Sequence, residues 1–339
     1  MVTSAAYAFS AALVQGERVR HRMPLAGGLV RRLCRAAHLE GIRRGFLAPD
    51  APGRAWLAPA GGRRCRGSGG SDAIVVDALT VVVRVEEGSF ARELPTACLL
   101  PWARPLADGL ARDETIAADS PVDLWLLAEP ADGATPVDLP PYRLYTAPEA
   151  CPSVQPLQPD LADDAAVPVW AAPSALASAL TWCRQNPAVE RAGVLLGSLA
   201  WSPAEGLFVD ARHFSPAVDA DEQAATVRFT RASWQAIHRH RLSLDPALQV
   251  VAWVHSHPCI DLGDGRPTAH FLSAVDLEIM AAFFDLPHCT AWVVDTGCPD
   301  DPAVACAVFG WDRAGVGVVR RTADVVLESL PSREESGRS

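Results

Sequence analysis

Apolar residues follow a helical spacing near the start of the chain and a strand-like spacing after it. Residues 27–46 repeat apolar side chains roughly on one helical face, which predicts a helix. Short apolar runs separated by Pro, Asp and Gly come next and are typical of strands. Residues 1–22 precede Met23, an alternative start, and are expected to be weakly ordered. The strands expected in this half are residues 73–85, 97–100, 122–128 and 142–146.

Helical and strand-like patterns alternate in the C-terminal half of the chain. Such alternation is typical of a mixed sheet covered by helices. The expected fold class is therefore α/β (α+β), with a mixed β-sheet flanked by helices and a small strand-rich domain before it. The expected helices are residues 174–184, 230–242 and 273–284, and the expected strands are 188–196, 207–213, 249–254, 291–295, 303–309 and 316–320.

Composition suggests how these elements divide into domains. The first 72 residues contain twelve Arg and four acidic residues, whereas the whole chain has a net charge of −10. A Gly-rich stretch at 61–70 is expected to be a flexible loop. The expected parts are a basic, partly helical segment (1–72), a small strand-rich domain of unassigned role (73–147), a Pro/Ala-rich linker (148–167), the α/β domain (168–322) and a polar tail (323–339).

Length and composition exclude several classes of protein. The 339 residues are 49% hydrophobic and 21% charged, which excludes a largely disordered chain. No run approaches the roughly 18 apolar residues of a membrane span, and no basic residue opens a secretory signal. A cytoplasmic location without membrane association is therefore expected. The basic segment lacks interleaved aromatic residues and nucleic-acid-binding motifs, so no nucleic acid partner is expected.

Two residue types carry further information. The nine Cys include no CxxC pair, so they are expected to be reduced thiols rather than a disulfide framework or a zinc ribbon. All 30 basic residues are Arg. Codon bias is the favoured reason for the absence of Lys, and protection from lysine-directed conjugation is the alternative.

The most informative stretch is the end of an expected apolar strand, which contains His255 and His257. Residues i and i+2 of a strand share a face, so both imidazoles can reach one metal ion. His238 and His240 have the same spacing, but they lie in an expected helix, where the two side chains diverge. These two are expected to lie on the surface. A pair of this type is as often structural as metal-binding.

Three more residues extend this pattern. Asp276 would complete a set of two His and one carboxylate, which is typical of a catalytic zinc site with an open position. Ser273 and Asp276 are also explained as the N-cap and third residue of a helix, and the two roles are compatible. Glu190 lies in an expected apolar strand, where a buried acid needs a partner or a purpose, unless it is a surface residue of an edge strand.

These pieces resemble the JAMM (MPN-type) zinc metalloprotease family, including its prokaryotic JAB-type, deubiquitinase-like members. The resemblance covers about residues 168–322. One departure is the spacing, because eighteen residues separate His257 from Asp276, more than is usual in the family. Residues 259–268 are therefore expected to form an enlarged loop over the cleft. The matching residues are Glu190, His255, Ser256, His257, Pro258, Ser273 and Asp276, and Asp261 and Asp264 are rival ligands.

The resemblance implies a zinc metallopeptidase of the isopeptidase type with one catalytic zinc ion. His255, His257 and Asp276 would hold the ion, which lowers the pKa of its bound water. Glu190 would take that proton and pass it to the leaving amine, and Ser273 would donate a hydrogen bond to the oxyanion.

The substrate that the resemblance implies is a ubiquitin-like protein, either conjugated or carrying a C-terminal extension. Components of a bacterial ubiquitin-like conjugation pathway are the implied further partners. Two alternatives remain. One is hydrolysis of small adducts on a sulfur-carrier-type protein. The other is a non-catalytic MPN scaffold, which is disfavoured because no expected ligand is missing.

Overall fold

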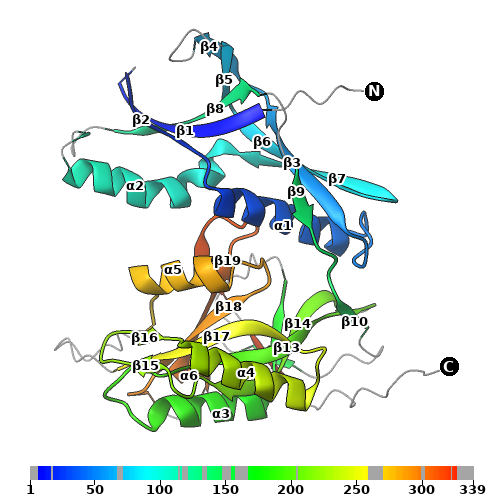
Figure 1. The fold of residues 1–339 in the computed structure, drawn as a ribbon, viewed down its shortest axis with the longest axis vertical. Coiled ribbons are helices and arrows are strands. Elements are labelled where there is room, and N and C mark those ends of the chain that lie inside the picture. Colours follow the sequence, from blue (N-terminus) through cyan, green and yellow to red (C-terminus); the bar gives the residue numbers. More distant parts are fainter. Residues whose placement is uncertain are drawn as a thin grey trace. The chain divides into compact units, whose positions relative to one another are not determined.

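The computed structural model contains several β-sheets together with α-helices (Figure 1). The chain divides into two compact units, the first made of residues 1–142 and 312–317 and the second of residues 143–311 and 318–339. No helix within the described residues is long and apolar enough to cross a membrane. The structure describes residues 7–16, 18–66, 72–113, 115–116, 121–131, 136–146, 154–156, 167–203, 205–258, 270–298, 302–321 and 323–326.

The first unit consists of a five-stranded and a four-stranded sheet with helices α1 and α2 (Figure 1). The strand orders are β2-β1-β8-β5-β4 and β7-β6-β3-β9, and the paired strands of both sheets are antiparallel. The elements are β1 (Tyr7–Gln15), β2 (Arg18–Pro24), α1 (Gly27–Arg43), β3 (Gly53–Ala60), β4 (Arg63–Arg66), β5 (Asp72–Val76), β6 (Ala78–Val85), β7 (Gly88–Pro95), the 3-10 helix η1 (Thr96–Leu99), α2 (Leu100–Arg112), β8 (Asp123–Pro130) and β9 (Val137–Leu139).

Several expectations for this unit need correction. The described residues before Met23 are ordered, because β1 lies between β2 and β8 and buries its apolar side chains. Residues 97–100 were expected to form a strand, but they complete η1 and begin α2. The boundary at residue 72 is also wrong, since β4 and β5 pair across it and leave part of the expected 61–70 loop in a strand. The helix expected over 27–46 is confirmed as α1.

The second unit is built on a ten-stranded mixed sheet. Its strand order is β11-β21-β12-β14-β13-β17-β18-β19-β20, and β10 pairs with β13 beside this path. The elements are β10 (Leu144–Thr146), β11 (Val154–Pro156), β12 (Val169–Ala171), α3 (Pro173–Arg184), β13 (Ala192–Ser202), β14 (Gly206–Pro216), β15 (Asp221–Glu222), β16 (Val227–Arg228), α4 (Arg231–Leu244), β17 (Gln249–His257), α5 (Ala274–Phe283), β18 (Thr290–Asp295), α6 (Pro302–Ala305), β19 (Cys306–Trp311), β20 (Val318–Arg321) and β21 (Asp324–Val326).

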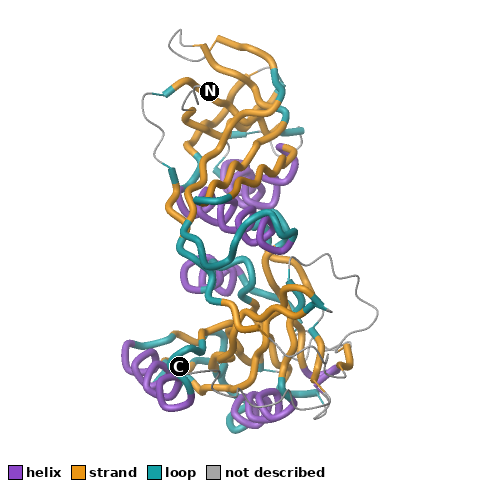
Figure 2. The backbone as a smooth tube through the Cα atoms, turned by 90° about the vertical axis from the view of Figure 1, so that its right-hand side faces the viewer, coloured by secondary structure: helices purple, strands orange, loops and turns teal. Residues whose placement is uncertain are grey.

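Helices cover both faces of this sheet, which explains why its central strands are almost continuously apolar. Strands β13, β17 and β18 bury nearly every residue. One face packs Ile237 of α4 and Met280 of α5 against Trp253 of β17. Helix α3 packs against β13, β14 and β17 and lies on the face of β17 to which Ser256 points. Figure 2 shows these helices in purple beside the orange strands. The expected mixed sheet flanked by helices is thus confirmed.

The sheet extends into two segments that were expected to lie outside it. Residues 154–156 of the expected linker form β11, and the rest of residues 148–166 lies outside the described residues. Residues 324–326 of the expected tail form β21, which pairs with both β11 and β12. The strand expected over 303–309 begins only at residue 306, after the short helix α6.

Strand β13 contains a glycine that its neighbouring strand requires. A Cβ atom added to Gly197 would clash with the carbonyl oxygen of Asp210. The register between β13 and β14 shifts between Leu196 and Gly197, so the close approach coincides with a bulge. The small residue therefore permits the tight pairing of the two long strands that lead towards the site described below.

Helix α1 buries His38, which is 1% exposed and lies against the ring of Tyr142 at 5.3 Å. Neither ring nitrogen has a hydrogen-bond partner among the described residues. Burial lowers the pKa of His38 to about 4, because the charged imidazolium is poorly solvated there. The unfolded chain therefore takes up this proton at a higher pH than the folded chain does.

This difference predicts that acid destabilises the protein through His38. The folded pKa lies below the unfolded value, so stability is complete above about pH 6.5 and falls by about 3 kcal/mol towards about pH 4. A His38→Phe variant keeps an aromatic ring but cannot titrate. As the pH falls from about 7.5 to about 4.5, the urea midpoint of this variant should increase relative to that of the wild type. As a control, changing the exposed His238 to Gln should leave the pH dependence of the urea midpoint unchanged. If the midpoint of His38→Phe depends on pH in the same way as that of the wild type, the prediction is wrong.

Candidate metal centre

The last residues of β17 place two imidazoles on one face of the sheet. Trp253, His255 and His257 alternate with Val254 and Ser256 along the strand, so the first three share a face. His255 is fully buried, and its ring stacks on Trp253 with centroids 4.0 Å apart and an interplanar angle of 13°. His257 is 5% exposed. The expected convergence of the two imidazoles is what the structure shows.

Asp276 reaches the same place from the N-terminus of α5. Ser273 is the N-cap, and its side chain accepts a hydrogen bond from the Asp276 backbone N–H at 3.2 Å. In return, the Ser273 backbone N–H donates to Asp276 Oδ2 at 2.7 Å, which completes a capping box. Asp276 is 4% exposed. The expected cap therefore exists, and it fixes the carboxylate that faces the two imidazoles.

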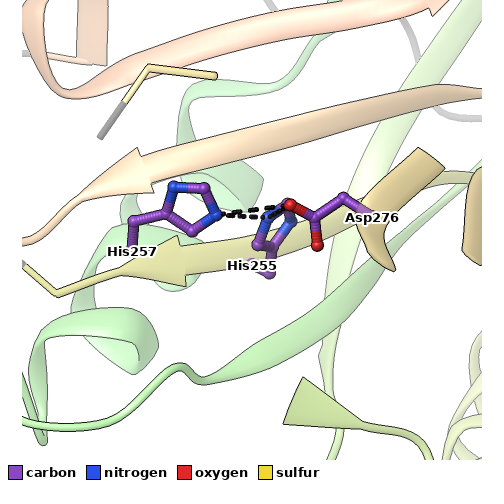
Figure 3. Close-up of side chains that lie close together, drawn as sticks. All are labelled: His255, His257 and Asp276. Carbon is purple, nitrogen blue, oxygen red and sulfur yellow. Dashed lines mark hydrogen bonds and ion pairs between the residues drawn. The ribbon is translucent and has the colours of Figure 1, made fainter. Parts of the chain in front are cut away.

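The three side chains bring one ligand atom each into a single cluster (Figure 3). His255 Nε2 lies 3.1 Å from His257 Nε2. Asp276 Oδ2 lies 3.6 Å from His255 Nε2 and 3.5 Å from His257 Nε2. The two contacts to the carboxylate are longer than ordinary hydrogen bonds, whereas the distance between the two Nε2 atoms lies within hydrogen-bond range.

The spacing and chemistry of these atoms fit a zinc ion. Tetrahedral zinc with ligands about 2.0–2.1 Å away separates those ligands by about 3.4 Å, close to all three distances. Two imidazole nitrogens and one carboxylate oxygen are also a ligand set of catalytic zinc sites. With Nε2 facing an ion, the N–H group of each neutral imidazole is on Nδ1. Both Nδ1 atoms are buried and have no hydrogen-bond partner among the described residues.

The protonation states in the cluster suit metal binding. Burial lowers the pKa of His255, which favours the neutral ring that coordinates metals. Burial alone would raise the pKa of Asp276, but the adjacent imidazoles and the Ser273 backbone hold it well below its usual range. These shifts favour a neutral nitrogen ligand at His255 and an ionised oxygen ligand at Asp276.

Glu190 lies beside this cluster but not in the strand that was expected to carry it. It precedes β13 by two residues and is 7% exposed, so it is neither a strand residue nor a surface glutamate. Its Oε1 atom is 4.0 Å from His257 Nε2. Burial raises the pKa of Glu190 to about 7, partly opposed by His257 and reinforced by Asp276. The carboxyl group is thus available as a proton acceptor next to the candidate ligands.

The backbone around Glu190 is fixed to the strand that carries the imidazoles. Its own N–H donates to the Gln223 carbonyl at 2.7 Å. The Arg191 backbone N–H donates to Ser256 Oγ at 2.9 Å, and the Ser256 N–H donates to the Arg191 carbonyl at 2.8 Å. Ser256 therefore joins the Glu190 segment to β17 from the face opposite the cluster.

The Arg191 side chain adds further anchors that sequence analysis missed. Its guanidinium carbon lies 3.5 Å from the centroid of the Trp182 ring, and its Nε atom pairs with Glu222 at 3.1 Å. These contacts join α3 and the β15–β16 hairpin to the residue that follows Glu190. No pattern in the sequence marks them, because the partners come from two separate elements.

The other residues considered from the sequence are the second His pair, the rival ligands and the enlarged loop. His238 is exposed on α4, as expected. His240 was also expected on the surface, but it is half-buried, and its Nδ1 atom lies 2.9 Å from Ser215 Oγ. The rival ligands Asp261 and Asp264, and the enlarged loop expected over 259–268, lie outside the described residues.

Comparisons with known proteins give little further information. No family model matches the sequence, and no curated protein matches it. Among solved structures, the chain is similar to the solution structure of protein DSY2949 from Desulfitobacterium hafniense, with 18% sequence identity and a TM-score of 0.34. The match covers 48% of this chain and 95% of that chain. A likeness of this size supports no argument about fold or function.

The geometry predicts that each chain binds one zinc ion through His255, His257 and Asp276. Removing one ligand leaves too few for a tetrahedral catalytic site, so His257→Ala should lose at least about 90% of bound zinc after dialysis. Metal analysis on protein of known concentration measures the stoichiometry. His238→Ala, taken from the other His-x-His pair, should keep full stoichiometry. Full zinc content in His257→Ala would contradict the assignment of the site.

Proposed function

We propose that this protein is a zinc-dependent hydrolase of the JAMM type, and that its second unit has the MPN-type arrangement. The observation that carries the proposal is the convergence of His255, His257 and Asp276 with Glu190 beside them. Three protein ligands leave one position of a tetrahedral ion open, which is typical of catalytic rather than structural zinc. A purely structural cluster would not need a buried carboxyl group next to it.

Each residue has a role that its position supports. His255, His257 and Asp276 would hold the ion, which supplies Lewis acidity and lowers the pKa of water. Glu190 would accept a proton at Oε1 and return it to the leaving amine, since its carboxyl group is buried and lies next to a ligand. The Ser273 hydroxyl accepts from Asp276 N–H through its oxygen, which leaves its own proton free to be donated to an oxyanion.

We infer the substrate class from the motif rather than from the geometry. The arrangement of Glu190, the His-Ser-His-Pro run that begins at His255, and Ser273 with Asp276 resembles enzymes that cut after the C-terminus of ubiquitin-like proteins. The proposed substrate is therefore a ubiquitin-like protein, conjugated or carrying a C-terminal extension. Incubation with candidate ubiquitin-like fusions, with products weighed by mass spectrometry, tests this proposal. It also distinguishes peptide cleavage from removal of a small adduct.

The proposal predicts that Glu190→Gln abolishes turnover without losing the metal. The amide keeps the shape of the side chain but cannot accept the proton, so turnover should fall by about 100-fold or more. Zinc analysis and steady-state kinetics on the same sample measure both properties. Glu278→Gln, an exposed change on the helix that carries Asp276, should behave as the wild type. Near-normal turnover of zinc-loaded Glu190→Gln would remove Glu190 from the mechanism.

A second prediction concerns the segment that positions Glu190. Ser256→Ala removes the acceptor of the Arg191 N–H, so that segment should move and turnover should fall by about 10-fold, a barrier increase of about 1.4 kcal/mol. Zinc content should stay at one per chain, and Ser256→Thr should restore turnover, because it keeps the hydroxyl. Ser215→Ala removes another buried hydroxyl bond, to His240, and should leave turnover unchanged. Equal losses in the two alanine variants would indicate general destabilisation instead.

A further inference from the structure

A groove with a volume of about 440 Å³ runs along the outer side of α4 and includes none of the cluster residues. Its size is at the lower end of pockets that bind small molecules. Residues 231, 235 and 239 follow one ridge of the helix at a spacing of four, and residues 234 and 238 follow the next ridge. The lining residues are Arg231, Trp234, Gln235, His238 and Arg239.

The charge of this helix contrasts with that of the protein. Helix α4 contains three Arg and two His but no acidic residue, whereas the chain carries −10. Arg231 and Arg239 are exposed, and neither forms an ion pair with any described residue. Elsewhere in the same unit, Arg191 and Arg212 each pair with a carboxylate. The groove therefore combines two cationic groups that form no ion pair within the part of the chain that the structure describes.

An aromatic surface separates these two charges. Trp234 stacks on Phe229 with ring centroids 4.8 Å apart, and the ring of Phe283 on α5 lies 6.0 Å away. Phe283 is 62% exposed, which is costly for a large apolar side chain in water. An apolar group that covers Trp234 and Phe283 would remove this surface from water.

We propose that the groove binds an acidic, extended segment of a partner protein, with one apolar side chain between two carboxylates. Eight residues of helix place the Cα atoms of Arg231 and Arg239 about 12 Å apart along the axis. An extended chain covers that distance in about four residues. Two carboxylates at this separation would each meet a guanidinium, and the residue midway would rest on Trp234.

The balance of charge favours a peptide over a nucleic acid. A phosphate backbone carries closely spaced negative charges and is bound by a basic surface larger than two arginines. The acidic protein around α4 would repel such a polymer but would tolerate a short segment with two charges. This proposal does not depend on the hydrolase activity, because binding requires neither zinc nor turnover.

Fluorescence polarisation of a labelled Glu-Gly-Leu-Gly-Glu peptide with the full chain tests the proposal. We expect saturable binding that weakens by at least about 10-fold when both Glu become Gln, or when Leu becomes Ser. The charge reversals Arg231→Glu and Arg239→Glu should each weaken binding by a similar factor. Arg104→Glu, an exposed change in the first unit with the same effect on net charge, should not.

Three outcomes would overturn the proposal. They are no binding at about 1 mM protein, equal binding by the Gln peptide, and unchanged binding by the two charge-reversal variants. Cross-linking locates the contact independently, because a photoreactive group in place of Leu should label residues 231–239 or Phe283. Labelling elsewhere would contradict the assignment. If an oligonucleotide with the same total charge as the peptide displaces it at the same concentration, the groove would be assigned to nucleic acid instead.

Discussion

The alternation of side chains along β17 is the constraint on which the candidate site depends. Because successive residues of a strand point to opposite faces, His255 and His257 enter the layer of α4 and α5, while Ser256 points towards α3. One strand therefore supplies two candidate ligands on one side and an anchor for the Glu190 segment on the other. A shift of register by one residue would exchange these roles and dismantle both.

The capping box at α5 satisfies two requirements with one carboxylate. Asp276 Oδ2 accepts the Ser273 N–H, one of the donors that a helix N-terminus leaves without an intrahelical partner, and it faces both imidazoles. The same oxygen thus stabilises the helix and sets the ligand geometry. A helix-capping residue has little rotational freedom, so Asp276 is positioned by local structure rather than by the cluster itself. This explains how a residue far along the chain from the His pair joins the cluster.

The parts of the site that obey short-range rules are those that the sequence predicts. The i, i+2 spacing of His255 and His257 and the N-cap at Ser273 depend only on local geometry, and both are present in the structure. The apolar neighbours of Glu190 predict a strand there, but its hydrogen bond to the Gln223 carbonyl holds it outside β13. Residues 97–100 are helical although a strand is predicted there, because a short apolar run fits either structure. The pairing of β1 with β8 joins residues more than a hundred positions apart, which no local pattern records.

Burying the polar atoms of the cluster also costs free energy. Two imidazole Nε2 atoms and a carboxylate oxygen face one another within a buried site, and both Nδ1 atoms lack partners among the described residues. An unpaired buried polar group costs about 1–3 kcal/mol, so the site carries several kcal/mol of uncompensated cost. A divalent cation would offset this cost by binding all three ligand atoms at once, and its binding free energy would then add to the stability of the fold. The direct contacts within the cluster are a weaker substitute, because the carboxylate contacts of 3.5 and 3.6 Å are long for hydrogen bonds and only the two Nε2 atoms, 3.1 Å apart, lie within the ordinary range. The buried polar groups of the cluster therefore support the proposal of a metal site, since a bound cation would compensate for their burial.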